Sequence, residues 1–390
     1  MRIRNFIILI VSILCYAYVI HWQFLIYLVL SGGILLIDKL KKPRIKKTLS
    51  WLTILLLICG FPILKGFSNG IIYGYSVFSF SAISYIVDQI RNKKNYSSID
   101  TLIYLFFFPK MMAGPIVRAA DFIPQLSIMN LKIVSIYKGG KLLIYGFFLK
   151  MIIADNILYS TIDGTGLNLL MQSVIFGIQF YIDFYSYSII AVGLALCLGI
   201  TMPYNFDNPY SAQSFKDFWK KWNITLSSWL KDYIYIPLGG NHKSKYLTQL
   251  NVLITFIISG LWHGLSFPFI FWGICHALLV NVEKYFSLQH RLKNKTLKFG
   301  FRAIVITITI LLWQLFRFEK FDDIIRYCND LFQYSTFNEV DIISLITSIL
   351  VLIAVESKII KHTIFGMSME RNYMYLQPII TQYFIDNKSE

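Results

Sequence analysis

Long apolar runs separated by short polar segments follow one another along almost the whole chain. A helix needs about 20 residues to cross the roughly 30 Å apolar layer of a membrane, and many of these runs approach that length. No run of about ten residues alternates apolar and polar positions as a barrel strand does. The pattern therefore predicts an all-α, polytopic bundle of about 10–12 transmembrane helices. The predicted spans cover residues 5–20, 22–37, 48–64, 70–90, 101–117, 138–160, 167–182, 183–200, 247–265, 267–283, 299–318 and 342–360. The first and seventh pairs are continuous apolar runs that could be divided differently.

Composition supports this interpretation. Of 390 residues, 56% are hydrophobic and 15% are charged, whereas a soluble domain carries about a quarter charged residues. The N-terminus begins with basic residues before an apolar run, but it lacks a signal-peptide cleavage pattern, so we interpret it as the first span.

The net charge of +16 does not indicate a nucleic-acid partner, because the basic residues cluster in short loops at 38–47, 91–94 and 291–295. With the predicted spans, these loops and the N-terminus fall on one side of the membrane. This distribution is typical of the cytoplasmic side and predicts cytoplasmic chain ends.

No repeat or linker divides the chain, so one membrane domain over residues 1–390 is expected, with N-terminal spans at 1–74, a core at 75–326 and a C-terminal part at 327–390. Residues 203–246 mix aromatic and charged residues too densely for a lipid-facing span. Their spacing predicts an amphipathic helix in the membrane interface, either with no further role or lining a site. A second amphipathic segment, 319–332, is predicted to be a surface helix.

Polar residues inside apolar runs indicate possible chemistry, because each needs a partner or a wet cavity. His263 is the strongest candidate, since Gly260, Gly264 and Pro268 predict a broken backbone around it. A neutral imidazole suits general-base work on a hydroxyl. His276 lies thirteen residues further on, about 20 Å along a continuous helix, which argues against a shared metal ion. It could equally be a buried, hydrogen-bonded core residue.

Other polar residues are weaker candidates. Asn223 could orient a substrate or cap a broken helix, and Asp183 is expected to make structural hydrogen bonds. Arg118 follows Pro109, Gly114 and Pro115 in residues 106–126, which predicts an interrupted helix with a cation near its end, as a re-entrant segment or an anion contact. The remaining histidines, His21, His242, His290 and His362, are expected near the membrane interface. The five cysteines are expected to be small buried residues without metal or redox work.

Several common motifs are missing from the sequence. It has no phosphate-binding glycine-rich loop, no dinucleotide fingerprint, no His-x4-Asp arrangement and no Gly-x-Ser-x-Gly elbow. No cofactor or metal ion is expected.

Six segments carry a resemblance to a known family: 75–88, 107–126, 179–193, 205–241, 259–264 and 311–326. These segments follow one another in the same order as in the membrane-bound O-acyltransferase (MBOAT) superfamily, which the chain therefore resembles. The resemblance is strongest to the bacterial branch that acetylates polysaccharides such as alginate. The long central segment followed by Gly-Leu-Trp-His-Gly is the most specific part. The resemblance implies helices around a buried catalytic pocket.

The resemblance also implies roles for individual residues. His263 matches the histidine of the family that acts as general base. Asn223 matches the second signature position, where this branch usually has histidine and more distant members have asparagine. Trp222, Trp262, Asp183, Arg118, Asp232 and His276 are expected to support the pocket.

The implied reaction moves an acyl group, expected to be acetyl from acetyl-CoA, from the cytoplasm to a hydroxyl on the outer side of a bacterial plasma membrane. The acceptor would be a glycan or a partner protein that modifies it. D-alanyl transfer to lipoteichoic acid from a carrier protein is an alternative within the family. A transporter or flippase with His263 as proton relay, or a scaffold without catalysis, are alternatives from other classes, although the chain shows no repeated halves.

Overall fold

The computed structural model describes residues 2–67, 74–92, 94, 96–128, 131–158, 160, 164–242, 244–286, 294–335, 339–357, 360 and 364. Helices and turns, with no strand, make up these residues, so the predicted all-α class is confirmed. The longer helices are α1 (Arg2–Ile20), α2 (Phe24–Asp38), α3 (Pro43–Phe67), α4 (Tyr75–Asn92), α8 (Ile133–Phe147), α9 (Gly166–Cys197), α12 (Lys245–His263), α13 (Phe267–Tyr285), α15 (Lys295–Trp313), α16 (Phe321–Leu331) and α17 (Glu339–Glu356). The shorter ones are α5 (Ser98–Phe106), α6 (Ala119–Phe122), α7 (Gln125–Ile128), α10 (Phe215–Lys221) and α11 (Ile224–Leu230).

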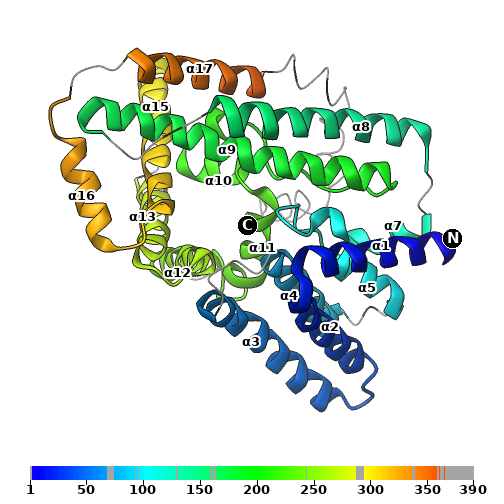
Figure 1. Ribbon diagram of the computed structural model, residues 1–390. Helices are drawn as coiled ribbons and strands as arrows, with labels where there is room; N and C mark the ends of the chain where they lie inside the picture. The colour runs from blue at the N-terminus through cyan, green and yellow to red at the C-terminus, as the bar shows by residue number, and fades with distance from the viewer. Residues whose placement is uncertain are drawn as a thin grey trace.

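The helices pack in two groups around a shared interior (Figure 1). In one group, α9 packs lengthwise against α8 and is also contacted by α15, α16 and α17. In the other, α3 and α5 pack against α4, α1 packs against α5, and α2 contacts α3 and α5. The α12–α13 hairpin and the short helices α10 and α11 lie between the groups, so the central part of the chain is held inside the molecule.

Several helix boundaries differ from the predicted spans. The spans predicted at 167–182 and 183–200 are one helix, α9, because this apolar run contains no proline or polar break. The span predicted at 101–117 is wrong as one helix: α5 ends at Phe106, just before Pro109, and the chain continues irregularly to Arg118. That interruption confirms the break predicted within 106–126.

The predicted pair 5–20 and 22–37 is divided by a short 3₁₀ turn at His21–Gln23, where the exposed His21 has a left-handed backbone (φ 54°). In the region predicted as 138–160, α8 continues as a π-helix over Phe148–Ile157. Part of the span predicted at 70–90 lies outside the described residues, and α4 begins at Tyr75.

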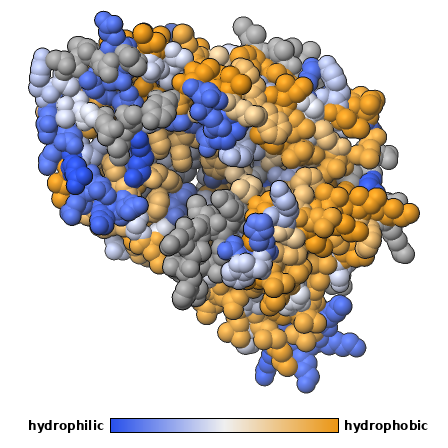
Figure 2. Space-filling model, in the orientation of Figure 1, coloured by the Kyte–Doolittle hydropathy of each residue, from blue (hydrophilic) through white to orange (hydrophobic). Residues whose placement is uncertain are grey.

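Three helical stretches of the described residues are long and apolar enough to cross a membrane, namely Ile3–Asp38, Gly166–Cys197 and Lys295–Phe316. The larger number of spans stays a prediction. The surface is rich in large apolar side chains, such as Ile3, Phe6 and Leu14 on α1, as a lipid-facing surface requires. Figure 2 shows this apolar surface over the right and lower parts of the view, with hydrophilic residues beside α16 on the left and at the lower tip.

The segment 203–246 is not the single amphipathic helix predicted from its spacing. It forms α10 and α11, which are separated at Trp222 and Asn223. A short π-helix over Lys231–Tyr235 follows α11. Its aromatic face is buried in the protein, with Phe218 at 1% and Trp222 at 3% exposure. The segment 319–332 contains α16, whose residues are mostly exposed, as predicted for a surface helix.

Candidate active site

His263 is the last residue of α12, directly before the turn into α13. The turn is possible because Gly264 is in an extended conformation and Pro268 stands in the first turn of α13, where its missing N–H costs no hydrogen bond. Gly260 allows the two helices to approach closely, since a Cβ there would lie 2.2 Å from the carbonyl oxygen of Phe269. The break predicted around His263 is therefore the tip of a tight helical hairpin.

Four aromatic rings surround the half-buried imidazole of His263 and form with it the histidine cluster. The ring centroids of Trp262 and Phe316 lie 4.2 and 4.6 Å from that of His263. Those of Trp272 and Phe269 lie 5.4 and 5.9 Å away. An imidazole in such apolar surroundings is shielded from bulk water while one side of it stays accessible.

His276 lies next to this cluster, because the hairpin folds α13 back along α12. Its side chain is fully buried, and Nδ1 accepts a hydrogen bond from Nε1–H of Trp219 at 3.4 Å. The Trp272 ring contacts both histidines, at 5.4 Å from His263 and 4.9 Å from His276. The separation expected for a continuous helix thus does not apply. Among the described residues no group of three or more His, Cys, Asp or Glu side chains could hold a metal ion.

Asn223 occupies the break between α10 and α11. Its backbone is left-handed (φ 40°), a conformation that asparagine tolerates better than most residues. Its carbonyl accepts from the N–H of Ser227 at 2.9 Å, whereas its side chain does not cap α11. The structure therefore gives Asn223 a backbone role in the helix break, and its predicted catalytic role stays a prediction.

Trp222, the preceding residue, connects this break with the histidine cluster. Its ring lies 4.6 Å from that of Trp313, which lies 5.5 Å from Phe316 of the cluster. Glu283 of α13 anchors the same segment, since its buried carboxylate accepts from the N–H of Phe215 at 2.6 Å. Sequence reasoning did not select Glu283, although an acidic residue near the end of an apolar run was a usable signal.

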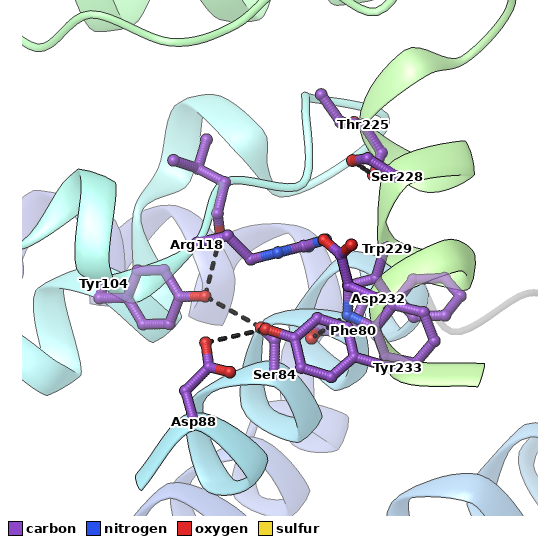
Figure 3. Close-up of polar contacts among 11 residues, drawn as sticks. Phe80, Ser84, Asp88, Tyr104, Arg118, Thr225, Ser228, Trp229, Asp232 and Tyr233 are labelled. Carbon is purple, nitrogen blue, oxygen red and sulfur yellow. Dashed lines mark hydrogen bonds and ion pairs between the residues drawn. The ribbon is translucent and has the colours of Figure 1, made fainter. Parts of the chain in front are cut away.

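Arg118 lies in a second, polar group at the start of α6, the arginine cluster (Figure 3). Nη2 of Arg118 lies 3.0 Å from Oδ2 of Asp232, and its guanidinium stacks 4.8 Å from the ring centroid of Tyr233. The Tyr233 hydroxyl donates to Asp88 at 2.8 Å, and Tyr104 adds a hydroxyl that donates to the carbonyl of Val117 at 2.9 Å. Burial raises the pKa of Tyr233, so its hydroxyl stays a donor.

One polar atom of the arginine cluster is not satisfied: Nη1 of Arg118 is buried and has no hydrogen-bond partner in the part of the chain that the structure describes. The irregular segment before Arg118 is fixed to α11, because the N–H of Ile116 donates to the Thr225 hydroxyl at 2.9 Å. Lys110, which sequence reasoning did not single out, is fully buried nearby and donates to the Ser81 hydroxyl at 3.0 Å.

A stripe of α4 joins the two clusters. Ser76, Phe80, Ser84 and Asp88 recur every four residues and share one helix face. Ser76 accepts from Nε1–H of Trp262 at 3.1 Å, and Asp88 bonds to Tyr233. Twelve residues of helix place the two ends about 18 Å apart.

Aromatic rings fill the interval between the ends of this stripe. Phe80 lies 5.3 Å from Trp262 and 4.6 Å from Trp229, whose ring is 5.1 Å from Tyr233. Ring contacts therefore run beside the α4 stripe from the histidine cluster to the arginine cluster.

Asp183 belongs to neither cluster. The Asp183 carboxylate forms an ion pair with Lys150, whose Nζ also lies 2.6 Å from Oδ1 of Asp155. The Asp183 side chain is 41% exposed. Asp183 thus takes part in an ion pair, and its predicted support of the pocket stays a prediction. Asp232 forms an ion pair with Arg118 and belongs to the arginine cluster.

The remaining predicted features have varied outcomes. His242 is exposed, and His290 and His362 lie outside the described residues. The cysteines are not buried as expected: Cys59 and Cys328 are exposed, and Cys15, Cys197 and Cys275 are half-buried. Four of them lie in apolar runs and Cys328 lies in the surface helix α16. These helices turn one side outward, where a cysteine is as acceptable as any small apolar residue.

Comparison with known proteins places these features in context. The chain is 32% identical over 273 residues to the "Probable alginate O-acetylase AlgI" of Pseudomonas aeruginosa, which covers 67% of this chain and 52% of that protein. It is 35% identical over 245 residues to the "Peptidoglycan O-acetyltransferase" of Helicobacter pylori (58% and 45%). It is 27% identical over 226 residues to the "Teichoic acid D-alanyltransferase" of Bacillus subtilis (54% and 57%).

The chain spans about half the length of these relatives. The sequence profile of the membrane-bound O-acyltransferase family matches residues 16–321, which include α4, both clusters and the stripe that joins them. The chain therefore belongs to the membrane-bound O-acyltransferase (MBOAT) family.

Proposed function

We propose that this protein is a membrane O-acyltransferase that moves an acyl group, acetyl in the favoured case, from a thioester to a hydroxyl of a cell-envelope polysaccharide or of a partner protein. The observation that carries the proposal is the position of His263. A base at the tip of a helical hairpin, half-buried among aromatic rings, can take a proton from a hydroxyl while most water is kept away.

His263 acts as general base in this proposal. It removes the proton of the acceptor hydroxyl, whose oxygen attacks the carbonyl carbon of the thioester. The C–S bond then breaks, and the leaving thiolate takes the proton from the imidazolium. The apolar rings around His263 protect the thioester from hydrolysis.

The position of Arg118 favours a donor that bears phosphate groups, such as acetyl-CoA. Its guanidinium is oriented by Asp232 and Tyr233, and Nη1 is left for a further acceptor. Arginine suits phosphate oxygens because its planar donors match their geometry. The aromatic rings between Tyr233 and Trp262 would then lie along an extended phosphopantetheine arm that runs from Arg118 toward His263. The length of the α4 stripe, about 18 Å, is the distance that this arm would cover.

The same arm is carried by coenzyme A and by acyl-carrier proteins, so D-alanyl transfer from a carrier protein is the second candidate. The match to a teichoic acid D-alanyltransferase supports it, at lower identity than the matches to O-acetylases. The O-acetylase matches favour acetyl transfer to a glycan.

We also propose a bacterial plasma membrane, with the N-terminus in the cytoplasm. The basic loop at 38–47 and the end of α4 at Asn92 support this orientation, because Tyr85 of α4 donates to Asp38 and both basic loops lie at one end of the helices. The arginine cluster near Asp88 would then face the donor side.

The test is to purify wild type and His263→Ala, confirm equal folding by melting curves, and supply radiolabelled acetyl-CoA or D-alanyl carrier protein with envelope glycan. Label that reaches glycan or a co-purifying protein from acetyl-CoA, with wild type alone, supports acetyl transfer. Transfer only from the carrier protein supports the second candidate. Equal transfer by His263→Ala rejects the general-base role, and substrate flux without any acyl transfer would support a transporter.

A further inference from the structure

Trp272 and His276 carry polar atoms that take no part in the proton transfer proposed for His263. Nε1 of Trp272 and Nε2 of His276 are buried, and neither has a hydrogen-bond partner among the residues that the structure describes. Both side chains are almost completely inaccessible, at 1% and 0% exposure. Burying a polar group without a hydrogen-bond partner is unfavourable, so two neighbouring ones call for an explanation.

Both atoms are donors. The indole Nε1–H can only donate. In His276, Nδ1 accepts from Nε1–H of Trp219, so the proton of the neutral ring is on Nε2. The site therefore presents two N–H groups that make no hydrogen bond within the described residues.

The two donors lie together, beside the proposed base. Trp272 and His276 are four residues apart on α13, hence on one helix face, and their ring centroids are 4.9 Å apart. The Trp272 ring is also 5.4 Å from that of His263. A group bound by the pair would thus lie next to the imidazole.

The chemistry of the pair selects its ligand. A water molecule would accept two hydrogen bonds here, but its own protons would face aromatic rings. A carbonyl oxygen needs only donors. It fits better still when it becomes negative, because donors in a dry site stabilise such charge strongly.

We propose that Trp272 Nε1–H and His276 Nε2–H form a donor pair that binds the acyl carbonyl oxygen and stabilises its negative charge during transfer. This inference rests on the proposed function. As the acceptor oxygen forms its bond to the carbonyl carbon, the π electrons of the C=O bond move to the carbonyl oxygen, which Trp272 and His276 hold. His263 keeps the proton that it took from the acceptor hydroxyl. When that electron pair returns, the C–S bond breaks, and the thiolate leaves with the proton from His263.

The variants Trp272→Phe and His276→Leu test the pair, because each removes one N–H. His276→Gln should keep a donor, and Trp51→Phe on the exposed face of α3 is a matched control. With purified wild type, acetyl-CoA and envelope glycan, kcat and KM for the donor are measured alongside melting curves. We expect about a 100-fold loss of kcat for Trp272→Phe and for His276→Leu, little change in KM, and less than about a 10-fold loss for His276→Gln.

The outcomes separate this inference from the proposed function. Wild-type kcat in folded Trp272→Phe, with transfer still dependent on His263, overturns the donor pair alone. A loss for His276→Gln as large as for His276→Leu also overturns it, because packing rather than the N–H would then matter. Should His276→Leu fail to fold, Trp272→Phe and His276→Gln still decide. Absence of transfer by wild type from either donor rejects the proposed function itself.

Discussion

The histidine cluster and the arginine cluster lie at opposite ends of one stripe of α4, yet they are built on opposite physical principles. Around His263 the neighbours are aromatic rings, and the buried atoms Trp272 Nε1 and His276 Nε2 have no hydrogen-bond partner within the described residues. Around Arg118 the neighbours are charged and hydroxyl groups that satisfy one another, except for Nη1. The first arrangement favours a reaction that creates charge in a dry site, and the second favours holding a charge that is already present.

Substitutions in the two clusters should therefore change different kinetic constants. Groups that act only in the transition state change kcat, whereas groups that hold the substrate throughout change KM.

Gly260→Val should disrupt the histidine cluster and leave the arginine cluster in place. The added side chain would meet the carbonyl oxygen of Phe269, whose distance from a Cβ is only 2.2 Å, and force α12 away from α13. We expect a loss of about 3 kcal/mol in stability, measured by thermal or denaturant unfolding in detergent. Gly32→Ala is the control, because a Cβ at Gly32 has nothing within 4 Å. Unchanged stability of Gly260→Val would contradict the tight hairpin.

Arg118→Met should raise KM for acetyl-CoA about 10- to 100-fold with little change in kcat, since a charged hydrogen-bond donor is lost. Arg118→Lys should recover part of the affinity, because it restores the charge without the planar donors. Initial rates over a range of donor concentrations measure both constants. A fall in kcat at unchanged KM would remove the distinction between the clusters.

Phe80→Leu tests the contact between the clusters. It keeps an apolar side chain but removes ring contacts with Trp262 and Trp229, at 5.3 and 4.6 Å. We expect a loss of about 1 kcal/mol in stability. A double-mutant cycle with Trp229→Leu should reveal coupling of at least about 0.5 kcal/mol. Strict additivity of the two changes would mean that the rings do not transmit packing along the stripe.

Asp183→Asn should have the smallest effect, although Asp183 is an ionisable residue within an apolar run. Its ion pair with Lys150 is part-exposed, at 41% for the Asp183 side chain, and such pairs contribute less than about 1 kcal/mol. Transfer rates with acetyl-CoA should stay within about twofold of wild type. A larger loss of kcat would place Asp183 in the reaction and extend the site beyond the two clusters.

Much of the fold followed from the sequence because apolar run length is a direct measure of what a helix can bury in lipid. The all-α class, the break at 106–126 and the surface helix at 319–332 all came from local pattern. The errors arose where local pattern is ambiguous. The length of the apolar run at 167–200 suited two spans as well as one long helix, although no proline divides it. The spacing in 203–246 could not show that Asn223 has a left-handed backbone.

The residue pattern alone identified His263 as the prominent ionisable group, because the glycines and the proline around it predict a broken backbone. It also placed Arg118 at the end of an interrupted helix. Only the tertiary structure decided the partners: Phe316 and Trp272 around His263, Asp232 and Tyr233 around Arg118, and Trp272 between the two histidines. The physical reason is that helix formation depends on near neighbours in sequence, whereas ring packing and ion pairing depend on how the helices lie together in space, with Arg118 and Asp232 114 positions apart.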